Sequence, residues 1–201
     1  MRKRQATWSS QQGTTLVELL IALVLLGVVT AGIYAMVVSS ANAARSTNAF
    51  LLTQAQVRAA LDHIVDEGRW ASGVNAAQPN CVTFRIPQDT PFSALSPYAV
   101  TFAYDAGQQA VVRQESTNPD AAECPPTSPE VLAFHVVHPG SPGNPCGGTV
   151  GLCFEYFDAL GNSLGSAPLS LGDIARVRVV VTSTRDGASR TFAGDVALRA
   201  R

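Results

Sequence analysis

The sequence predicts an α+β protein in which one long N-terminal helix precedes a mainly antiparallel β domain. The first observation behind this prediction is an apolar run at residues 19–38, followed without a proline by a helical repeat that reaches Glu67. The second is a change, from Cys81 onward, to short alternating segments separated by turns rich in proline and glycine. A length of 201 residues leaves room for one globular domain after the helix.

The apolar run is long enough to cross a membrane. Residues 19–38 contain no charge, and a helix of about 20 apolar residues spans a bilayer core of roughly 30 Å. The preceding leader carries Arg2, Lys3 and Arg4 and no acidic residue. Positive charge on this side keeps the N-terminus in the cytoplasm. We therefore expect a single-pass protein of the inner membrane whose remaining residues lie outside the cytoplasm.

Glu18 is a carboxylate at the mouth of the apolar run. A charge inside a membrane segment is costly and usually marks function, although a charge near the interface can also reach the headgroups by snorkelling. An ordinary export signal has its small residues after the apolar core. Here Gly13 lies before the run, so cleavage at Gly13 would leave the run attached to the mature chain.

This arrangement resembles the class III signal of type IV pilins and type II secretion pseudopilins. The resemblance rests on Gly-Thr-Thr-Leu-Val-Glu at residues 13–18 and on apolar residues on both sides of Glu18. It implies that a prepilin peptidase cleaves after Gly13 and methylates the new N-terminal amine of Thr14, where the family prefers phenylalanine. Glu18 would then be the fifth mature residue. Its implied role is to set axial register by pairing with the Thr14 amine of a neighbouring subunit.

Residues 39–67 are predicted to continue the helix as an amphipathic stem. One helical face carries apolar residues at steps of seven, four and three: Phe50, Val57, Leu61 and Ile64. We expect this face to pack against the chain's own globular domain rather than to form a coiled-coil seam. The expected parts of the chain are a leader at 1–13, a membrane and filament-core helix at 14–38, a stem at 39–70 and a β-rich head at 71–201.

The head is predicted to consist of strands joined by turns and irregular loops. Strands are expected at residues 81–86, 98–104, 110–114, 131–137, 151–158, 174–184 and 190–198, with a short segment near Leu164. Asp158 and Asn162 flank Gly161 and favour a turn over a calcium loop, because a full acidic ligand set is missing. Arg176 and Arg178 are interpreted as the solvent-facing side of an edge strand, with a contact to a neighbouring subunit as the alternative.

All four cysteines follow the membrane segment: Cys81, Cys124, Cys146 and Cys153. An even number in an oxidising compartment favours disulfides, and four cysteines permit three connectivities. The Gly-rich turn between Cys146 and Cys153 favours that pair, which leaves Cys81 with Cys124. Neither a C-x-x-C spacing nor a suitable histidine spacing occurs, so no metal site is expected.

The charge balance argues against a dedicated nucleic-acid surface. The whole chain has a formal net charge of −1, and 11 basic and 15 acidic residues remain once the leader is removed. The mature chain is therefore acidic, near −4, and Lys3 is the only lysine. DNA is an unfavoured partner on this ground. No cofactor is expected, and no catalytic constellation supports an enzyme.

Loose motifs in the head are similar to those of PilW-type minor pilins and J-type minor pseudopilins. They include Tyr156-x-Asp158-x-x-Gly161 and Val196-x-Leu198-Arg199. The implied function is that of a non-enzymatic minor pilin that helps to initiate or cap a filament. The implied partners are the prepilin peptidase, the inner membrane and other major and minor pilins. The alternatives are a minor pseudopilin of type II secretion and a tip adhesin or DNA-binding minor pilin.

Overall fold

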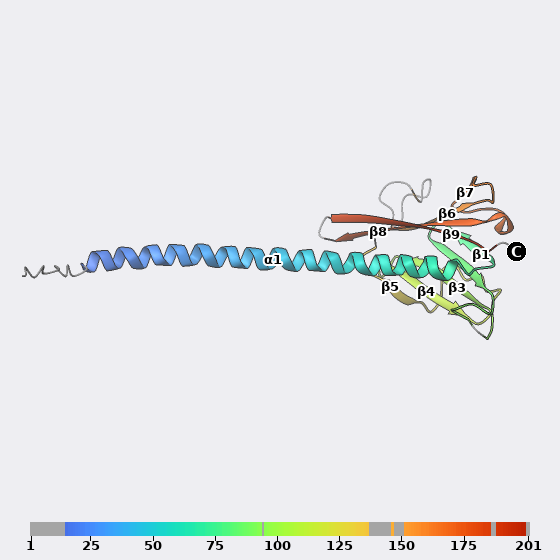
Figure 1. Ribbon diagram of the computed structural model, residues 1–201, viewed down its shortest axis with the longest axis horizontal. Coiled ribbons are helices and arrows are strands. Elements are labelled where there is room, and N and C mark those ends of the chain that lie inside the picture. The colour runs from blue at the N-terminus through green and yellow to red at the C-terminus, as the bar shows by residue number, and fades with distance from the viewer. Residues whose placement is uncertain (1–14, 94, 137–145, 147–150, 186–187, 200–201) are drawn as a thin grey trace, which may run out of the picture. The chain divides into compact units, whose positions relative to one another are not determined.

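The computed structural model describes residues 15–93, 95–136, 146, 151–185 and 188–199. It contains one long helix and two antiparallel sheets (Figure 1), which confirms the predicted fold class. The sheet orders are β1-β2-β3-β4-β5 and β7-β6-β8-β9. The elements are α1 (Leu16–Gly68), β1 (Gly73–Gln78), β2 (Cys81–Ile86), β3 (Tyr98–Asp105), β4 (Ala110–Ser116), β5 (Glu130–Ala133), β6 (Leu152–Phe157), β7 (Ser163–Gly165), the 3-10 turn η1 (Leu171–Asp173), β8 (Arg176–Arg185) and β9 (Ala188–Ala197).

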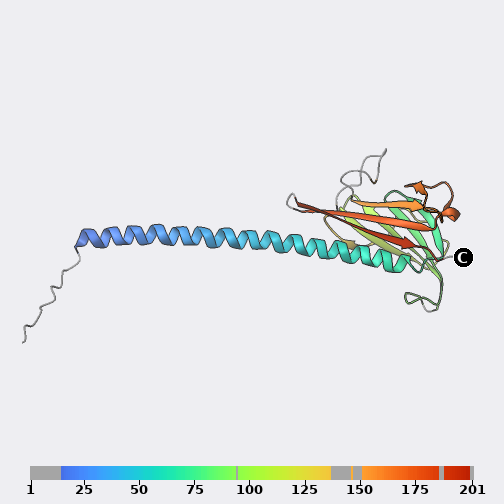
Figure 2. The same ribbon diagram turned by 45° about the horizontal axis from the view of Figure 1, so that its top comes forward.

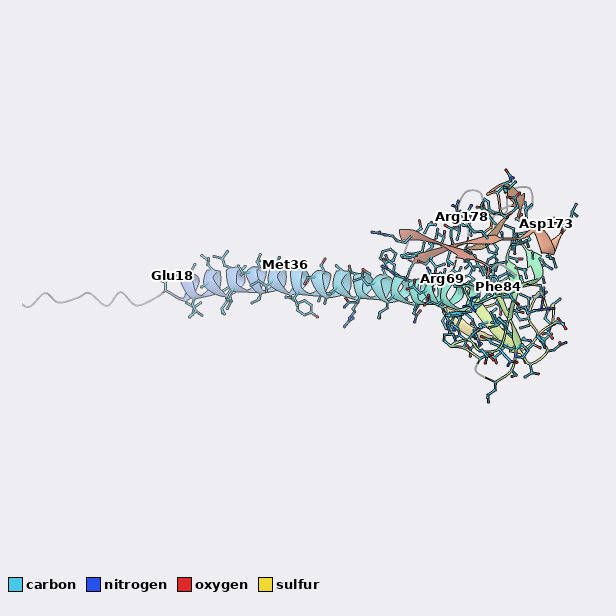
Figure 3. The ribbon with its side chains drawn as sticks, turned by 45° about the vertical axis from the view of Figure 1, so that its right-hand side comes forward. Glu18, Met36, Arg69, Phe84, Asp173 and Arg178 are labelled. Carbon is cyan, nitrogen blue, oxygen red and sulfur yellow. A yellow bond between two sulfur atoms is a disulfide. The ribbon has the colours of Figure 1, made fainter. Side chains whose placement is uncertain are left out.

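Helix α1 contributes to two compact units, whose boundary falls between Thr47 and Asn48. In the described part of the first unit, every residue from 15 to 47 is exposed. Figure 3 labels Glu18 and Met36 on this part of the helix. Among the described residues, α1 is the one helix long and apolar enough to cross a membrane. Its first half therefore has apolar side chains all around, as a lipid-facing helix requires.

The second unit uses only one face of α1, and that face is buried. The buried residues are Thr53, Val57, Ala60, Leu61, Ile64, Val65, Glu67 and Gly68. The apolar residues among them join one apolar core cluster with residues from both sheets, which confirms the predicted packing of Val57, Leu61 and Ile64 on the chain's own domain. In Figure 2 the two sheets lie against this end of the helix.

Strand β9 lies unusually close to the last turns of α1. A Cβ atom added to Gly194 would stand 2.7 Å from Cγ2 of Val65, and one added to Gly68 would stand 2.9 Å from Cγ1 of Val196. Real Cβ contacts are almost never this short, so both positions require a residue without a side chain. The pair of glycines lets helix and strand backbones approach closely.

The two sheets also bond to each other directly. The hydroxyl of Tyr156 on β6 donates to the Gln78 carbonyl at 2.9 Å, and the Phe154 amide donates to the Pro79 carbonyl at 2.8 Å. At another point of contact, Val136 forms an isolated bridge with Ser183 of β8. The head is therefore one core with two sheets rather than two separable modules.

A loop at residues 117–129 covers the outer face of the first sheet. Cys124 in this loop forms a disulfide with Cys81 of β2. Beneath it, Thr83 donates to or accepts from Thr101 at 2.9 Å, and Asn75 donates to the loop carbonyls of Pro119 and Ala121. The second disulfide joins Cys146 to Cys153. Both pairs agree with the connectivity favoured from the sequence.

Three sequence expectations need correction. Strand β1 was not predicted, because Gly-Val-Asn-Ala-Ala-Gln has low β propensity and is extended only through its pairing with β2. The strand expected at 131–137 ends at Ala133, since His135 has a φ of 59° that interrupts extended backbone; Val137 lies outside the described residues. Strand β8 is central, between β6 and β9, so Arg176 and Arg178 do not lie on an edge strand.

Glu67 is a fully buried carboxylate at the C-terminal end of α1. Arg113 of β4 donates to it twice, from Nε to Oε2 at 3.0 Å and from Nη2 to Oε1 at 2.8 Å. The Tyr98 hydroxyl also donates to Oε1. The hydrogen bond to Glu67 is the main cause that raises the pKa of Arg113. This bidentate pair fixes the end of the helix against the first sheet.

Substituting Glu67 tests how much the helix end depends on this pair. Glu67→Ala leaves the Arg113 guanidinium, whose side chain is 14% exposed, without its main partner, and we expect a loss of about 3–5 kcal/mol. Urea unfolding of the full chain in detergent, followed by Trp70 fluorescence in a Trp8→Phe background, measures it. A double variant, Glu67→Met with Arg113→Met, removes both charges and is expected to lose much less. A Glu67→Ala chain as stable as the parent would contradict the role of the Glu67–Arg113 pair in fixing the helix end.

Two buried tyrosines make the head sensitive to alkaline pH. Burial is the main cause that raises the pKa of Tyr98 and of Tyr156 above the ordinary value of 10.0. The folded state therefore holds these protons more tightly than the unfolded state does. Their contribution to the free energy of unfolding is complete below pH 10. It is lost as the pH rises above 10, at about 1.4 kcal/mol per pH unit for each group. We expect phenolate absorbance from both residues to appear together with unfolding. Ionisation of Tyr98 and Tyr156 near pH 10 in a head that stays folded would contradict this expectation.

Candidate functional site

The N-terminal end of α1 is built by Thr15 and Glu18. The Glu18 amide donates to Oγ1 of Thr15 at 3.3 Å, and the Leu19 amide donates to the Thr15 carbonyl at 3.2 Å. Thr15 is thus the N-cap, and Glu18 is the third residue of the helix. A threonine followed three positions later by a glutamate is the sequence of a capping box. The local sequence therefore explains why the helix begins here.

The Glu18 carboxylate is exposed at the N-terminal end of α1, where the helix dipole is positive. The helix dipole favours a negative charge at this end by about 0.3–1 kcal/mol. Within the described residues 15–47 the only basic residue is Arg45, which lies roughly 40 Å along the helix at a rise of about 1.5 Å per residue. No cation on this part of α1 can therefore pair with Glu18.

Gly13 and Thr14 lie outside the described residues. Cleavage at Gly13 and modification of the Thr14 amine therefore stay predictions from the sequence. What the structure adds is that Glu18 lies in the first turn of α1, four positions after Thr14 in the sequence. A carboxylate and an amine belonging to the same short segment are the two groups that the predicted pairing requires.

Polar side chains in the apolar half of α1 bond to their own helix. Oγ1 of Thr30 donates to the carbonyl of Leu26 at 2.7 Å and lies 3.1 Å from that of Gly27. Oγ of Ser40, just past the apolar run, donates to the Val37 carbonyl at 3.0 Å. Polar groups satisfied within the helix can remain in lipid or against other helices. The apolar half of α1 can therefore lie in lipid or pack against other helices.

Asp158 forms a turn, as predicted. Its Oδ1 accepts from the amides of Leu160 and Asn162 at 2.9 and 2.7 Å, and Oδ2 accepts from Nδ2 of Asn162 at 2.9 Å. The hydrogen bond from the Asn162 side chain is the main cause that lowers the pKa of Asp158. Gly161 completes the turn with a φ of 86°. Among the described residues, no group of three or more His, Cys, Asp or Glu side chains could hold a metal ion.

Arg176 and Arg178 share the outer face of the second sheet with Phe157 and Asp195. Their guanidinium carbons lie 4.3 and 5.5 Å from the centre of the Phe157 ring, and Nε of Arg178 lies 3.3 Å from Oδ1 of Asp195. Figure 3 labels Arg178 on this sheet. Both arginines therefore have contacts within their own sheet, although the strand is not at an edge.

The buried Glu67 was not singled out from the sequence. A signal was present, because Glu67 follows Ile64 by three positions and so falls on the apolar stripe of the stem. A carboxylate on a buried face needs a partner of opposite charge. The sequence could not identify Arg113 as that partner, because 46 positions separate the two residues.

One comparison with known proteins gives a match. Residues 8–34 match the family model described as the prokaryotic N-terminal methylation motif. The match includes Gly13, Thr14 and Glu18 and residues 19–34 of the apolar run. No curated protein and no solved structure matches the chain.

The matched segment and the observed fold lead to the same class of protein. A pilin-type protein of this class is generally structural rather than enzymatic and is anchored in a membrane by its N-terminal helix. With its prepilin-type N-terminal motif, its long apolar helix and its β head, the chain fits a type IV pilin-like protein.

Proposed function

We propose that this protein is a non-enzymatic minor subunit of a type IV pilus-like filament and that it helps to initiate or cap assembly. The observation that carries the proposal is the position of Glu18 in the first turn of a helix that matches the methylation motif. The motif supports processing by a prepilin peptidase and assembly with other pilins. The two disulfides and the strand-rich head support the choice of a minor subunit.

The proposed processing divides the chain into a leader at 1–13, a filament-core helix at 14–38, a stem at 39–70 and a head at 71–201. Before assembly the chain spans the inner membrane once, with the leader in the cytoplasm and the head outside. The peptidase removes the leader after Gly13 and methylates Thr14. The apolar helix then leaves the membrane and packs among the helices of other pilins.

Glu18 guides this transfer by pairing with an amine. A carboxylate moved into a low-dielectric filament core is expensive unless an opposite charge meets it. The α-amine of a neighbouring subunit supplies that charge at the end of the same short segment, and two unit charges attract far more strongly in an apolar medium than in water. Subunits that stop at the wrong axial position leave both charges unpaired, so the pair selects the register.

Two other functions remain as alternatives. A minor pseudopilin of type II secretion uses the same helix and the same processing with a different filament, and genome neighbours separate the two. A tip adhesin or DNA-binding minor pilin would use the head to bind a ligand. The acidic mature charge counts against DNA, and salt-dependent DNA binding by the mature protein would favour it.

Variants of Glu18 and Thr15 separate intersubunit pairing from helix capping. Glu18→Gln keeps a side chain that suits a capping box but removes the charge, whereas Thr15→Ala removes the cap and keeps the charge. We expect Glu18→Gln to lower the fraction of chain recovered in sheared filaments at least about tenfold, the equivalent of about 1.4 kcal/mol. Thr15→Ala is expected to retain most of its incorporation.

The matched control is Asp66→Asn, which removes an exposed carboxylate from the stem and is expected to leave incorporation unchanged. Membrane levels of each variant, measured in the same cells, correct for differences in stability. Incorporation of Glu18→Gln at the parental level would overturn the pairing mechanism.

A further inference from the structure

The outer edge of β9 is the longest edge of the two described sheets. Strand β9 closes one side of the second sheet, whose order is β7-β6-β8-β9. Its ten residues pair with β8 without a register shift. In an antiparallel ladder, alternate residues direct their amide and carbonyl toward one neighbouring strand, and the residues between them direct theirs to the other side. About half of the β9 backbone groups therefore face away from β8.

The pairing of Thr182 identifies which residues of β9 face outward. The Thr182 amide donates at 2.6 Å to the carbonyl of Gly151, the residue before β6, so Thr182 directs its backbone groups toward β6. Thr182 is paired with Thr191 of β9, and their hydroxyl oxygens lie 2.8 Å apart, as expected for a pair that exchanges no backbone hydrogen bond. The backbone groups of Thr191 therefore point away from β8. By alternation, so do those of Ala193 and Asp195.

These outward backbone groups are open to solvent. Thr191, Ala193 and Asp195 are exposed, and within the part of the chain that the structure describes no hydrogen bond reaches their amides. Gly194 is half-exposed although one side of it lies against Val65. Because glycine has no side chain, its exposed surface is backbone. Another chain can therefore reach this edge.

Strand β9 lacks the features that protect the other edges. Natural sheet edges are kept short, bulged or interrupted by proline and lysine. The other edge strands of the described sheets, β1, β5 and β7, have six, four and three residues, and a register shift interrupts the pairing of each. Strand β9 has no register shift, no proline and no lysine. Of its two charged residues, Asp195 is paired with Arg178 at 3.3 Å, and Arg190 lies near the start of the strand.

A second copy of β9 does not suit this edge. Strand β9 runs in the same direction as the stem of α1 (Figure 2): Arg185 at the end of β8 bonds to Thr53 at 3.1 Å, and Val196 lies against Gly68. Two β9 strands paired antiparallel would direct their stems oppositely, whereas copies anchored by α1 in one membrane direct them alike. Two identical strands paired in parallel about a two-fold axis would place amide beside amide. The occupant is therefore a segment of a different polypeptide.

We infer that β9 binds an extended segment of a different protein, which adds a fifth strand to the four-stranded second sheet. The amides and carbonyls of Thr191, Ala193 and Asp195 pair with the backbone of this segment. On one face its side chains lie beside Phe192, which packs on the apolar core, so alternate residues of the segment are apolar. On the other face they lie beside Thr191 and Asp195 and are polar. A binding edge for a foreign strand goes beyond the proposed function of a filament subunit.

A peptide with the β8 sequence RVRVVVTSTR, residues 176–185, is the probe for this edge. Residues directly opposite each other share a face of the sheet, so the even-numbered, mainly polar residues of the peptide are the ones that bond to Thr191, Ala193 and Asp195. We expect saturable binding of the labelled peptide to the full chain in detergent, measured by fluorescence anisotropy. N-methylation of the peptide at Val180 is expected to weaken binding at least about tenfold. N-methylation at Val179, whose amide points to the other edge of the peptide, is the matched control and leaves binding unchanged.

Substitution of Ala193 tests the same edge from the side of the protein. Ala193→Pro removes one outward amide, and an edge strand tolerates proline where the amide faces solvent. We expect peptide binding at least about tenfold weaker, with the unfolding midpoint from Trp70 fluorescence unchanged in the Trp8→Phe background. Ala193→Thr keeps the amide and is expected to bind the peptide like the parent.

Three outcomes would overturn the inference. The first is a parent chain that does not bind the peptide. The second is binding that neither Ala193→Pro nor N-methylation at Val180 weakens. The third is a dimer of the chain alone that Ala193→Pro dissociates, because the edge would then bind a second copy. The mass of the mature N-terminus is independent of all three, so the proposed function stands or falls separately.

Discussion

The buried contact between the last turns of α1 and both sheets is the interaction on which the rest of the structure depends. The face from Thr53 to Gly68 supplies the residues that unite the two sheets in one core. Gly68 and Gly194 allow the close approach, and the Glu67–Arg113 pair fixes the helix end. This contact occupies one face of the second half of α1. The first half therefore remains free to contact lipid or other helices.

One continuous helix therefore meets two different surroundings. From Leu16 to Val38 its large apolar side chains are exposed in the described chain, which is stable only in a membrane or among other helices. From Thr53 onward the polar and apolar residues are segregated. Glu18 stands at the start of the first half without a basic partner on the described helix up to Arg45. In the proposed function, the amine of a neighbouring subunit supplies the partner for this carboxylate.

Local patterns predicted most of the elements, and long-range pairing explains the failures. Local sequence patterns predicted strand β2, the turn between β3 and β4, the apolar stripe of the helix and both cysteine pairs. Strand β1 was missed because its residues are extended only by pairing with β2. The central position of β8 and the partnership of Glu67 with Arg113 depend on contacts between distant segments, which periodicity does not contain. Glu18 was singled out from the residues next to it in the sequence, and its role in assembly stays a prediction.

The N-terminus of the mature protein tests the central claim most directly. The mature chain would contain no lysine, so its α-amine would be its only primary amine before methylation. Intact mass spectrometry, with and without an amine-reactive label and in cells with and without prepilin peptidase, reads both features at once. We expect a chain that begins at Thr14, carries one methyl group and has a single reactive amine only when the peptidase is present. An uncut chain with two reactive amines, at Met1 and Lys3, or a cut after the apolar run would contradict the account.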